Sequence, residues 1–308
     1  MLLERLSTVS APCGIEKWFR PRDDSPHMII PGSATQSLAA ALAAETDQRL
    51  ASVEYERFPD GEGIVRIDDP GEHAVVVAST LSDAAHVELL QLQDAAREAG
   101  ADAVTTVIPY LGYARQDRAF TDGEPVSARA VARAISTGTD RVLTVNPHEP
   151  GVCEYFDVPT TAVDAAGLLA DPLPADLTDP LFIAPDVGAT DLAESAMATY
   201  GRGRSDYFQK TRRSGTEVDI APSDAAVDGR DVVLIDDIIA TGSTMSESVS
   251  ILHDGGADRV FVTCVHPLLA SNALTKLTRA GVEAVYGSDT IERPVSDVTV
   301  APAIADAL

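Results

Sequence analysis

The amino-acid sequence contains an internal repeat, and this repeat restricts the possible folds more than any other feature of the chain. Residues 75–110 and 232–267 each read as an apolar strand, a loop, a helix, a Gly-Ala-Asp turn and a second strand. The strands are short runs rich in valine, which is typical of strands buried on both faces of a parallel sheet. Because a helix between two such strands forms a crossover unit, we predict an α/β fold with two tandem doubly wound domains.

The length of 308 residues suits the two domains that the repeat predicts. We expect the first domain to cover residues 28–166 and the second to cover residues 167–308. Residues 1–27 show neither a helical nor a strand period, whereas Met28 begins a pattern typical of a strand, a Gly-Ser turn and an alanine-rich helix. We therefore expect residues 1–27 to be a dispensable N-terminal extension. An ordered N-terminal arm is the alternative.

The charge of the chain excludes several classes of partner. A formal net charge of −25 repels phosphate backbones and anionic lipid headgroups, so we expect neither nucleic acid nor a membrane as a partner. Only three of the 23 basic residues are lysine, and an acidic chain with so few lysines suggests adaptation to high salt, which screens its charge. The three cysteines form no CxxC pair and predict neither a disulfide framework nor a zinc site. This cysteine usage favours a reduced, cytoplasmic location.

The loop after the first strand of the second repeat has the chemistry of a phosphate site, and it follows the carboxyl end of a predicted parallel strand. Gly242 permits close approach of the backbone, hydroxyl side chains supply donors, and the next helix adds free N–H groups. The alternative is a capping box formed by Thr244 and Glu247, with no ligand. It leaves two adjacent carboxylates unexplained, and these could accept hydrogen bonds from sugar hydroxyls. The candidate residues for a phosphorylated sugar are Asp236, Asp237, Ala240, Thr241, Gly242, Ser243 and Thr244.

The segment VVLIDDIIATGST at 232–244 resembles the phosphoribosyl-binding fingerprint of the phosphoribosyltransferase family, with Ser243 where a second glycine is common. The resemblance implies that both repeats form phosphoribosyltransferase-type domains. The first repeat has Ala78, Ser79 and Thr80 at the corresponding positions and lacks the acidic pair. We therefore expect one sugar site per chain.

Further segments resemble the ribose-phosphate diphosphokinases, in order and over nearly everything from Met28 onward. These segments are 57–62, 113–118 with 123–127, 146–148, 185–188 and 209–212. The chain looks like an archaeal member of that family, in keeping with its acidic composition. The resemblance implies an enzyme that transfers the diphosphoryl group of ATP to the anomeric hydroxyl of ribose 5-phosphate. The products would be AMP and 5-phosphoribosyl 1-diphosphate, which serves nucleotide biosynthesis.

The resemblance implies that Phe58, Asp60 and Glu62 form part of the ATP site. They would line an adenine pocket that commonly crosses a subunit interface, which implies a homo-oligomer, at least a dimer. The Phe58 ring offers a stacking face, and the two carboxylates can accept hydrogen bonds from the exocyclic amine of adenine. Taken alone, this segment reads as a surface turn.

A second implied part of the ATP site consists of Arg115, Gln116 and Asp117. The forked guanidinium group of Arg115 suits phosphate oxygens, and the other two side chains can orient the nucleotide or metal-bound water. The alternative for this segment is a solvated loop with an ordinary ion pair to Arg118.

The resemblance gives the catalytic role to Lys210 and Arg212. Phosphoryl transfer requires positive charge aimed at the shifting negative charge of the phosphates. Because glycines flank the segment, at 201, 203 and 215, we expect a flexible basic loop that closes over the nucleotide. The alternative is a basic patch on a surface hairpin.

The expected cofactor is Mg²⁺, which prefers oxygen ligands and would be coordinated largely by the substrate phosphates. By resemblance, His148 would lie near the metal of ATP, and Asp186 near the ribose phosphate. The chain departs from the family pattern at Asn146, where an aspartate is usual. We expect this change to weaken or rearrange a metal contact, with a water-mediated contact as the alternative.

Two other functions fit parts of the sequence. A purine or pyrimidine phosphoribosyltransferase would explain the second half, but neither the duplication nor the segments at 57–62 and 113–118. A non-catalytic regulatory paralogue would bind nucleotide and control a partner enzyme. The presence of Lys210, Arg212 and the acidic pair argues against that function, although Asn146 leaves room for it.

Overall fold

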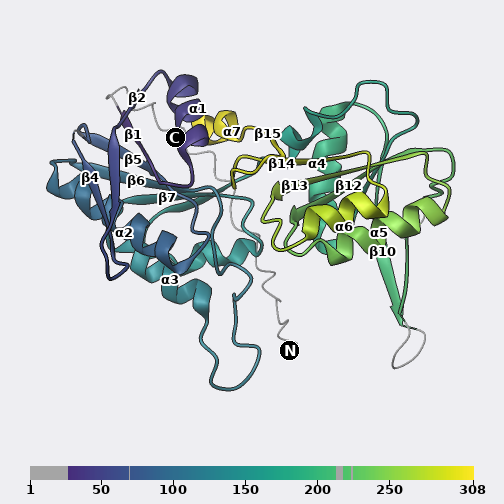
Figure 1. Ribbon diagram of the computed structural model, residues 1–308, viewed down its shortest axis with the longest axis horizontal. Coiled ribbons are helices and arrows are strands. Elements are labelled where there is room, and N and C mark those ends of the chain that lie inside the picture. The colour runs from purple at the N-terminus through teal and green to yellow at the C-terminus, as the bar shows by residue number, and fades with distance from the viewer. Residues whose placement is uncertain (1–26, 69, 213–217, 223–224) are drawn as a thin grey trace, which may run out of the picture.

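The computed structural model describes residues 27–68, 70–212, 218–222 and 225–308. Figure 1 shows two α/β domains side by side, the first formed by the first half of the chain and the second by most of the rest. The expectation that residues 1–27 are dispensable concerns a segment outside the described residues, apart from His27, and stays a prediction. Among the described residues, no helix is long and apolar enough to cross a membrane.

The first domain contains a six-stranded parallel sheet in the order β2-β1-β5-β6-β7-β8. Strands β5 and β6 and helix α2 form the first repeat, as predicted, and the antiparallel hairpin β3-β4 packs along α2. The strands are β1 (His27–Pro31), β2 (Arg49–Leu50), β3 (Val53–Arg57), β4 (Gly63–Ile67), β5 (His73–Val77), β6 (Ala103–Ile108), β7 (Arg141–Val145) and β8 (Thr160–Val163). The helices are α1 (Gln36–Thr46), α2 (Asp83–Glu98) and α3 (Ser127–Ser136), with short 3₁₀ turns η1 (Pro150–Tyr155) and η2 (Ala166–Ala170).

The second domain contains a seven-stranded sheet in the order β11-β10-β9-β12-β13-β14-β15, parallel except for β11. Strands β12 and β13 with helix α5 form the second repeat. The strands are β9 (Leu181–Ala184), β10 (Arg204–Arg212), β11 (Val218–Pro222), β12 (Asp231–Ile238), β13 (Arg259–His266), β14 (Ala284–Ser288) and β15 (Ser296–Val298). The helical segments are η3 (Val187–Ala189), α4 (Thr190–Tyr200), α5 (Ser243–Asp254), α6 (Ala273–Ala280) and α7 (Ala301–Ala307).

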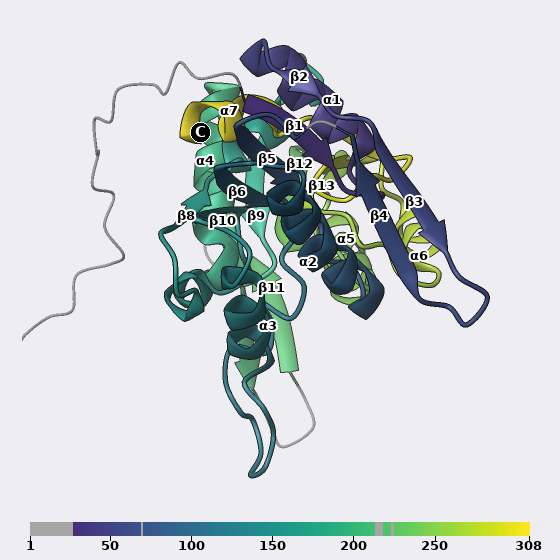
Figure 2. The same cartoon turned by 90° about the vertical axis from the view of Figure 1, so that its left-hand side faces the viewer.

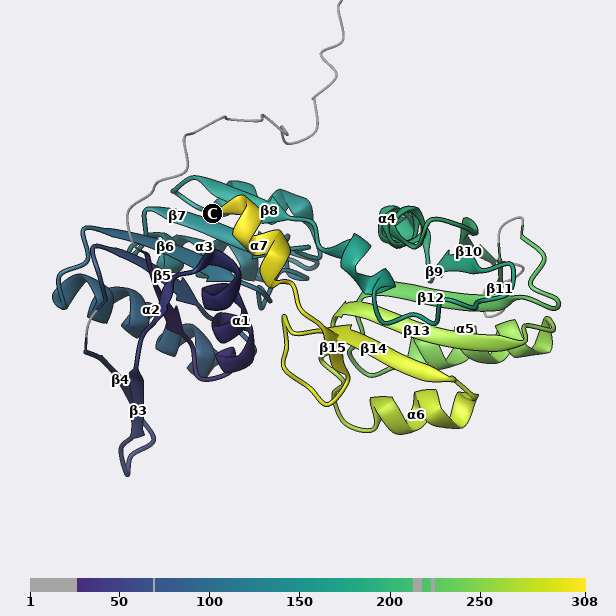
Figure 3. The ribbon, with the colours of Figure 1, turned by 90° about the horizontal axis from the view of Figure 1, so that it is seen from above.

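Helices cover both faces of each sheet, because successive strand residues alternate between two apolar layers. In the first sheet, Ile30 belongs to the core under α2 and α3, and Ile29 to the core under α1. In the second sheet, Leu234 packs toward α5 and α6, and Val233 toward α4, which lies on the opposite face in Figure 3. The structure thus confirms the predicted pair of doubly wound domains.

The C-terminal helix α7 returns to the first domain. It packs against α1, β7 and β8, as Figure 3 shows. Arg141, at the start of β7, donates hydrogen bonds to the carbonyls of Ala307 at 2.7 Å and Leu308 at 3.2 Å, where a helix terminus favours a cation. Ile304 of α7 and Phe182 of β9 belong to one apolar cluster, so the two domains share part of their core.

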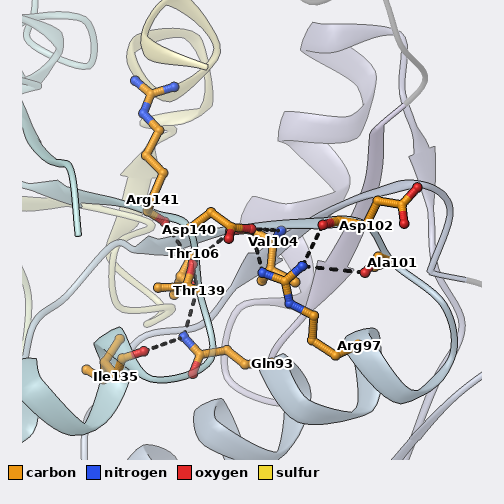
Figure 4. Close-up of polar contacts among 10 residues, drawn as sticks. All are labelled: Gln93, Arg97, Ala101, Asp102, Val104, Thr106, Ile135, Thr139, Asp140 and Arg141. Atoms are coloured by element: carbon orange, nitrogen blue, oxygen red, sulfur yellow. Dashed lines mark hydrogen bonds and ion pairs between the residues drawn. The ribbon is translucent and has the colours of Figure 1, made fainter. Parts of the chain in front are cut away.

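Polar contacts hold α2 and the loop before β7 against β6 (Figure 4). Gln93 of α2 donates to the Thr106 hydroxyl at 2.9 Å, which in turn donates to Thr139 at 2.9 Å. Arg97 of α2 forms an ion pair with Asp140 at 2.5 Å. These contacts fix the helix of the first repeat relative to its second strand.

The second repeat has its own buried ion pair, at the end of its sheet where β12 and β13 begin. Asp231 is only 1% exposed and accepts two hydrogen bonds from Arg259, at 2.9 and 2.6 Å, and one from the Thr178 N–H at 2.6 Å. Burial alone would raise the pKa of Asp231, but the hydrogen bonds and charge of Arg259 hold it below its usual range. The pair therefore joins both strands of the repeat to the chain that leads into β9.

We predict that Asp231→Asn lowers the free energy of unfolding at pH 7 by about 2 kcal/mol, because an Asn cannot form the charge-assisted pair. A carboxyl whose folded pKa is depressed stabilises the fold above the pKa of the unfolded chain, and this contribution is lost as pH falls through the folded value. The difference between wild type and variant should therefore shrink below about pH 4. Denaturant unfolding across that range measures it, with exposed Asp258→Asn as the control; a constant difference would contradict this assignment.

Candidate active site

The carboxyl ends of strands from both sheets meet at the junction between the domains. His148 follows β7 of the first sheet, and its Nδ1 lies 2.5 Å from Oδ2 of Asp237, near the end of β12 of the second. His266, the last residue of β13, approaches the carbonyl of Asn146 at 3.1 Å and packs edge-on against the ring of Tyr110. The carboxyl ends of strands from the two sheets therefore face one another within a single chain.

The predicted acidic pair lies at the end of β12. The N–H of Asp237 donates to the Asp236 carboxyl at 2.9 Å, and the N–H of Ile238 donates to the Asp237 carboxyl at 2.7 Å. Burial and the neighbouring charge of Asp237 raise the pKa of Asp236 well above its usual range, and the charge of Asp186 adds to this rise. The carboxyl group of Asp186, which follows β9, thus acts electrostatically on the acidic pair at the end of β12.

His148 balances this negative charge. Burial would raise the pKa of Asp237, but the hydrogen bond and charge of His148 hold it below its usual range. In return, the hydrogen bond to Asp237 raises the pKa of His148, against the opposing effects of burial and of the positive charge of Arg115. Asp237 is therefore the ionised member of the acidic pair, and its proton-bearing partner is an imidazole from the other domain.

The structure gives the Asn146 side chain a role in the backbone of the first domain. Its amide donates to the Asp164 carboxyl at 2.8 Å, and its carbonyl oxygen accepts from the N–H of Ala165 at 2.8 Å. The backbone has φ of 34°, a left-handed conformation that Asn tolerates better than most residues. An aspartate here would place a second carboxylate against Asp164. The side chain thus serves to anchor the loop that carries His148.

The predicted phosphate loop has the expected geometry. Gly242 adopts φ of 68°, and a Cβ at this position would lie 3.1 Å from the carbonyl oxygen of Ala273, so both the backbone angle and the packing require glycine. Gly242 is also the N-cap of α5 and provides no side-chain cap, so the capping box of Thr244 and Glu247 is not formed. Within the described chain, the N–H groups of residues 241–244 have no hydrogen-bond acceptor. These free donors at a helix start suit an anion.

On the other side of the junction, Arg115 and Gln116 line a cavity of about 440 Å³. Its wall also includes Thr80, Ser82 and Tyr113 from the start of α2 and the loop after β6. Asp117 is not in the lining of this cavity. Its backbone carbonyl accepts a hydrogen bond from Tyr155 at 2.7 Å, which joins the predicted segment to η1.

The side chains of Tyr110 and His148 are close to both halves of the site. Burial raises the pKa of Tyr110, the positive charge of Arg115 opposes this rise, and the negative charge of Asp237 adds to it. The same two charges shift the pKa of His148 in the same directions, since Asp237 raises it and Arg115 lowers it. The Arg115 side of the junction and the Asp237 side therefore belong to one continuous region.

The predicted residues Phe58, Asp60 and Glu62 lie elsewhere, at the exposed tip of the β3-β4 hairpin, which projects from the first domain in Figure 2. The turn is internally hydrogen-bonded: the N–H of Phe58 donates to the Glu62 carbonyl at 2.8 Å, and the N–H of Glu62 donates to the Asp60 carboxyl at 3.1 Å. Phe58 is 39% exposed. Among the described residues, no hydrogen bond or ion pair joins these three residues to the junction.

The structure places Lys210 and Arg212 in a strand, which corrects the expectation that they lie in a loop. Both belong to β10, and their backbones pair in antiparallel register with Ile220 and Val218 of β11. Figure 1 shows this two-stranded extension projecting from the second domain. The regular hydrogen bonding of a hairpin continues through the basic segment, so the flanking glycines do not make it a loop.

His266 was not predicted from the sequence, although it holds the junction together. Burial lowers its pKa to about 4, so the ring is neutral. Because the Asn146 carbonyl can only accept, Nε2 carries the proton, and Nδ1 then accepts from the Thr290 hydroxyl at 2.9 Å. The Thr290 carbonyl accepts in turn from Ser79 of the first repeat at 2.6 Å. The position of His266 at a repeat strand end was the one available signal.

The site contains carboxylate oxygens that suit a magnesium ion whose other ligands are phosphate oxygens and waters. Asp186 accepts from the N–H of Gly188 at 3.0 Å, and its charge reaches Asp236 across the ends of β9 and β12. A divalent cation would relieve the repulsion among these carboxyl groups. No preformed group of three or more protein ligands occurs among the described residues. The donor set therefore fits an ion that keeps waters and phosphate oxygens in its coordination shell.

Two protein-family models match the chain. The model described as the N-terminal domain of ribose phosphate pyrophosphokinase matches residues 27–138, and the model described as a phosphoribosyl transferase domain matches residues 154–295.

Similar proteins include ribose-phosphate pyrophosphokinases from Halobacterium salinarum, 64% identical over 91% of this chain and 100% of the relative, and from Methanopyrus kandleri, 44% identical over 91% and 98%. A crystal structure of phosphoribosylpyrophosphate synthetase from Mycobacterium smegmatis superimposes with a TM-score of 0.77 and 27% identity. The superposition covers 91% of this chain and 97% of that one.

We predict that Asp237→Asn lowers the pKa of His148, because the variant removes the carboxylate that stabilises the imidazolium. NMR titration of the His148 ring in the full-length protein measures the change. The control variant is Asp258→Asn, at an exposed aspartate before β13, which should leave the His148 titration unchanged. An unchanged His148 titration would contradict the contact between the domains.

Proposed function

The chain belongs to the family of ribose-phosphate pyrophosphokinases, which make 5-phosphoribosyl 1-diphosphate from ATP and ribose 5-phosphate, and we propose that it performs this transfer where His148 meets Asp237. It is accordingly a transferase of nucleotide biosynthesis. The observation that carries the proposed location is the contact between the two domains, because it brings an anion-binding loop and a separate cavity to one junction.

Ribose 5-phosphate binds, in this proposal, at the end of β12. The free N–H groups of the loop 241–244 receive the 5-phosphate, and the hydroxyl groups of Thr241, Ser243 and Thr244 surround it. Asp236 and Asp237 lie near the end of β12, just before this loop, and accept hydrogen bonds from the ribose hydroxyls. The ionised state of Asp237, maintained by His148, makes it the stronger acceptor of the two.

ATP binds on the opposite side of the junction. Arg115 contacts the phosphates, Gln116 orients the nucleotide, and Asp117 supports the segment that carries them. In the transfer, the anomeric oxygen bonds to the β-phosphorus, the bond from that phosphorus to the α,β-bridging oxygen breaks, and AMP leaves while the hydroxyl proton is released. The protein contributes mainly position and positive charge, which Lys210 and Arg212 would supply as the phosphates rearrange.

Mg²⁺ is the proposed cofactor, with His148 near the nucleotide side and Asp186 near the ribose side as the residues that would hold it or its waters. Bound magnesium would neutralise phosphate charge during the transfer. The Asn146 side chain is hydrogen-bonded to Asp164 and Ala165, which argues against a direct role for Asn146 in metal binding.

The test of the function is product identity. We predict that the protein, with ATP, ribose 5-phosphate and magnesium, forms AMP and no ADP, and that Lys210→Ala lowers turnover by at least about 100-fold while ribose 5-phosphate binding changes little. Chromatography of the nucleotides and calorimetric titration of ribose 5-phosphate measure the two effects. Formation of ADP, or equal losses of binding and turnover in the variant, would contradict the proposal.

The exposed hairpin suggests that the ATP site is completed by a second copy of the chain. Phe58, Asp60 and Glu62 belong to the tip of the β3-β4 hairpin, where Arg57 donates a hydrogen bond to the Gly61 carbonyl at 2.6 Å. The hairpin projects from the first domain (Figure 2). We therefore propose a homo-oligomer in which this tip covers the adenine of ATP bound beside Arg115 in a neighbouring subunit.

Complementation tests the shared pocket. Phe58→Ala and Arg115→Ala should each lose activity at least about tenfold, because each removes one side of the nucleotide site. Co-expression of the two variants should restore activity toward about a quarter of the wild-type value if two subunits exchange hairpins, since that is the share of sites with both groups intact. The matched control is co-expression of Phe58→Ala with itself. No recovery would contradict a shared pocket.

We further propose that the enzyme acts at high salt in the cytoplasm. The net charge of −25 is tolerable where salt screens it, and a relative at 64% identity comes from Halobacterium salinarum. Cys153 and Cys264, the two cysteines among the described residues, are buried and form no disulfide there, as fits a reduced environment.

A further inference from the structure

Helix α6 lies directly against the phosphate loop. The N–H of Leu269 donates to the Ile239 carbonyl at 2.9 Å, and the N–H of Ala270 donates to the Ala240 carbonyl at 2.8 Å. Gly242 packs against the backbone of Ala273, which is fully buried. The segment before α6 and the first turn of the helix therefore form the outer wall of the loop.

Lys276, one helical turn after Ala273, reaches back to the same loop. Its Nζ donates to the carbonyl of Thr241 at 3.0 Å and to the hydroxyl of Ser243 at 2.8 Å. These are the two residues on either side of Gly242. The contact is a specific one for this side chain: Arg279, in the last turn of α6, makes no hydrogen bond to the loop among the described residues.

The contact with Lys276 determines the orientation of the peptide bond between Thr241 and Gly242. A trans peptide is planar, so its C=O and N–H groups point in opposite directions. By holding the Thr241 carbonyl toward α6, Lys276 directs the N–H of Gly242 to the other face of the loop. That N–H is one of the free donors of the loop, whereas a carbonyl turned to the same face would repel an anion.

The positive charge of Lys276 also favours a phosphate at this loop. The chain carries −25, the acidic pair Asp236 and Asp237 lies a few residues before the loop, and the charge of Asp186 also acts on Asp236. An ammonium group held on the loop offsets this local negative potential, which would otherwise oppose the approach of a phosphate. Lys276 is one of only three lysines in the sequence.

We propose that Lys276 is a positioning residue for ribose 5-phosphate, which fixes the orientation of the Thr241–Gly242 peptide so that the loop receives the 5-phosphate. This inference rests on the proposed binding of that phosphate at residues 241–244. Lys276 acts through the loop and contributes to substrate binding, while the chemical step on ATP does not depend on it.

The test is Lys276→Met, which keeps the length and helix propensity of the side chain and removes its donors and charge. The KM for ribose 5-phosphate and its calorimetric dissociation constant should rise about tenfold, since one charge-assisted contact is lost. The KM for ATP and kcat should change less than about twofold. Lys276→Arg should recover most of the affinity, and Arg279→Met, on the same helix, should behave as wild type.

A loop variant separates the possible failures. Gly242→Val introduces a Cβ against Ala273 and a disfavoured backbone angle, so it should abolish ribose 5-phosphate binding. If it does, and Lys276→Met binds as wild type or loses kcat and ATP affinity equally, the role of Lys276 is overturned and the proposed site stands. If Gly242→Val binds ribose 5-phosphate normally, the proposed site is wrong and the inference fails with it. Circular dichroism of Lys276→Met and of Lys276→Gln identifies a loss caused by misfolding.

Discussion

The contact between His148 and Asp237 is the interaction on which the active site depends. Each residue lies near the carboxyl end of a strand of a different sheet, and neither sheet alone contains both the loop at 241–244 and the Arg115 cavity. The pair also sets the charge of the site, because the imidazole keeps Asp237 ionised while its neighbour Asp236 favours the protonated form. A conformational change that separated the domains would therefore disrupt geometry and protonation together.

The neutral ring of His266 forms a second contact between the same two domains. It connects the Asn146 carbonyl of the first domain with Thr290 of the second, and burial keeps it uncharged over the physiological range. Asn146 in turn anchors the backbone that carries His148. An asparagine at position 146 can donate to its neighbour Asp164, whereas an aspartate there would repel it. The Asn146 side chain therefore anchors the loop, and His148, two residues further on, makes the contact with Asp237.

Much of the fold and one half of the site could be predicted from the sequence. Valine-rich runs at equal spacing determine two buried parallel strands per repeat, and the loop chemistry at Gly242 follows from local rules of backbone freedom and helix termini. The rest depends on contacts between distant segments. Nothing local indicates that His266 meets Asn146, or that α7 returns to Arg141. Lys210 and Arg212 were placed in a loop because glycines flank them, but their pairing with β11 is a tertiary property that composition does not reveal.

The two repeats use the ends of their first strands differently. At the strand end of the first repeat, Ser79 and Thr80 occupy the positions of Asp236 and Asp237, and both are nearly fully buried. Their hydroxyls form hydrogen bonds within the protein. The Ser79 hydroxyl donates to the Thr290 carbonyl and accepts from the backbone N–H of Tyr110, and the Thr80 hydroxyl accepts from the N–H of Gly112 at 2.8 Å. The first copy therefore uses its strand end to join the domains. The second copy leaves its loop donors free for a ligand, so the asymmetry of the repeats produces both the junction and the site.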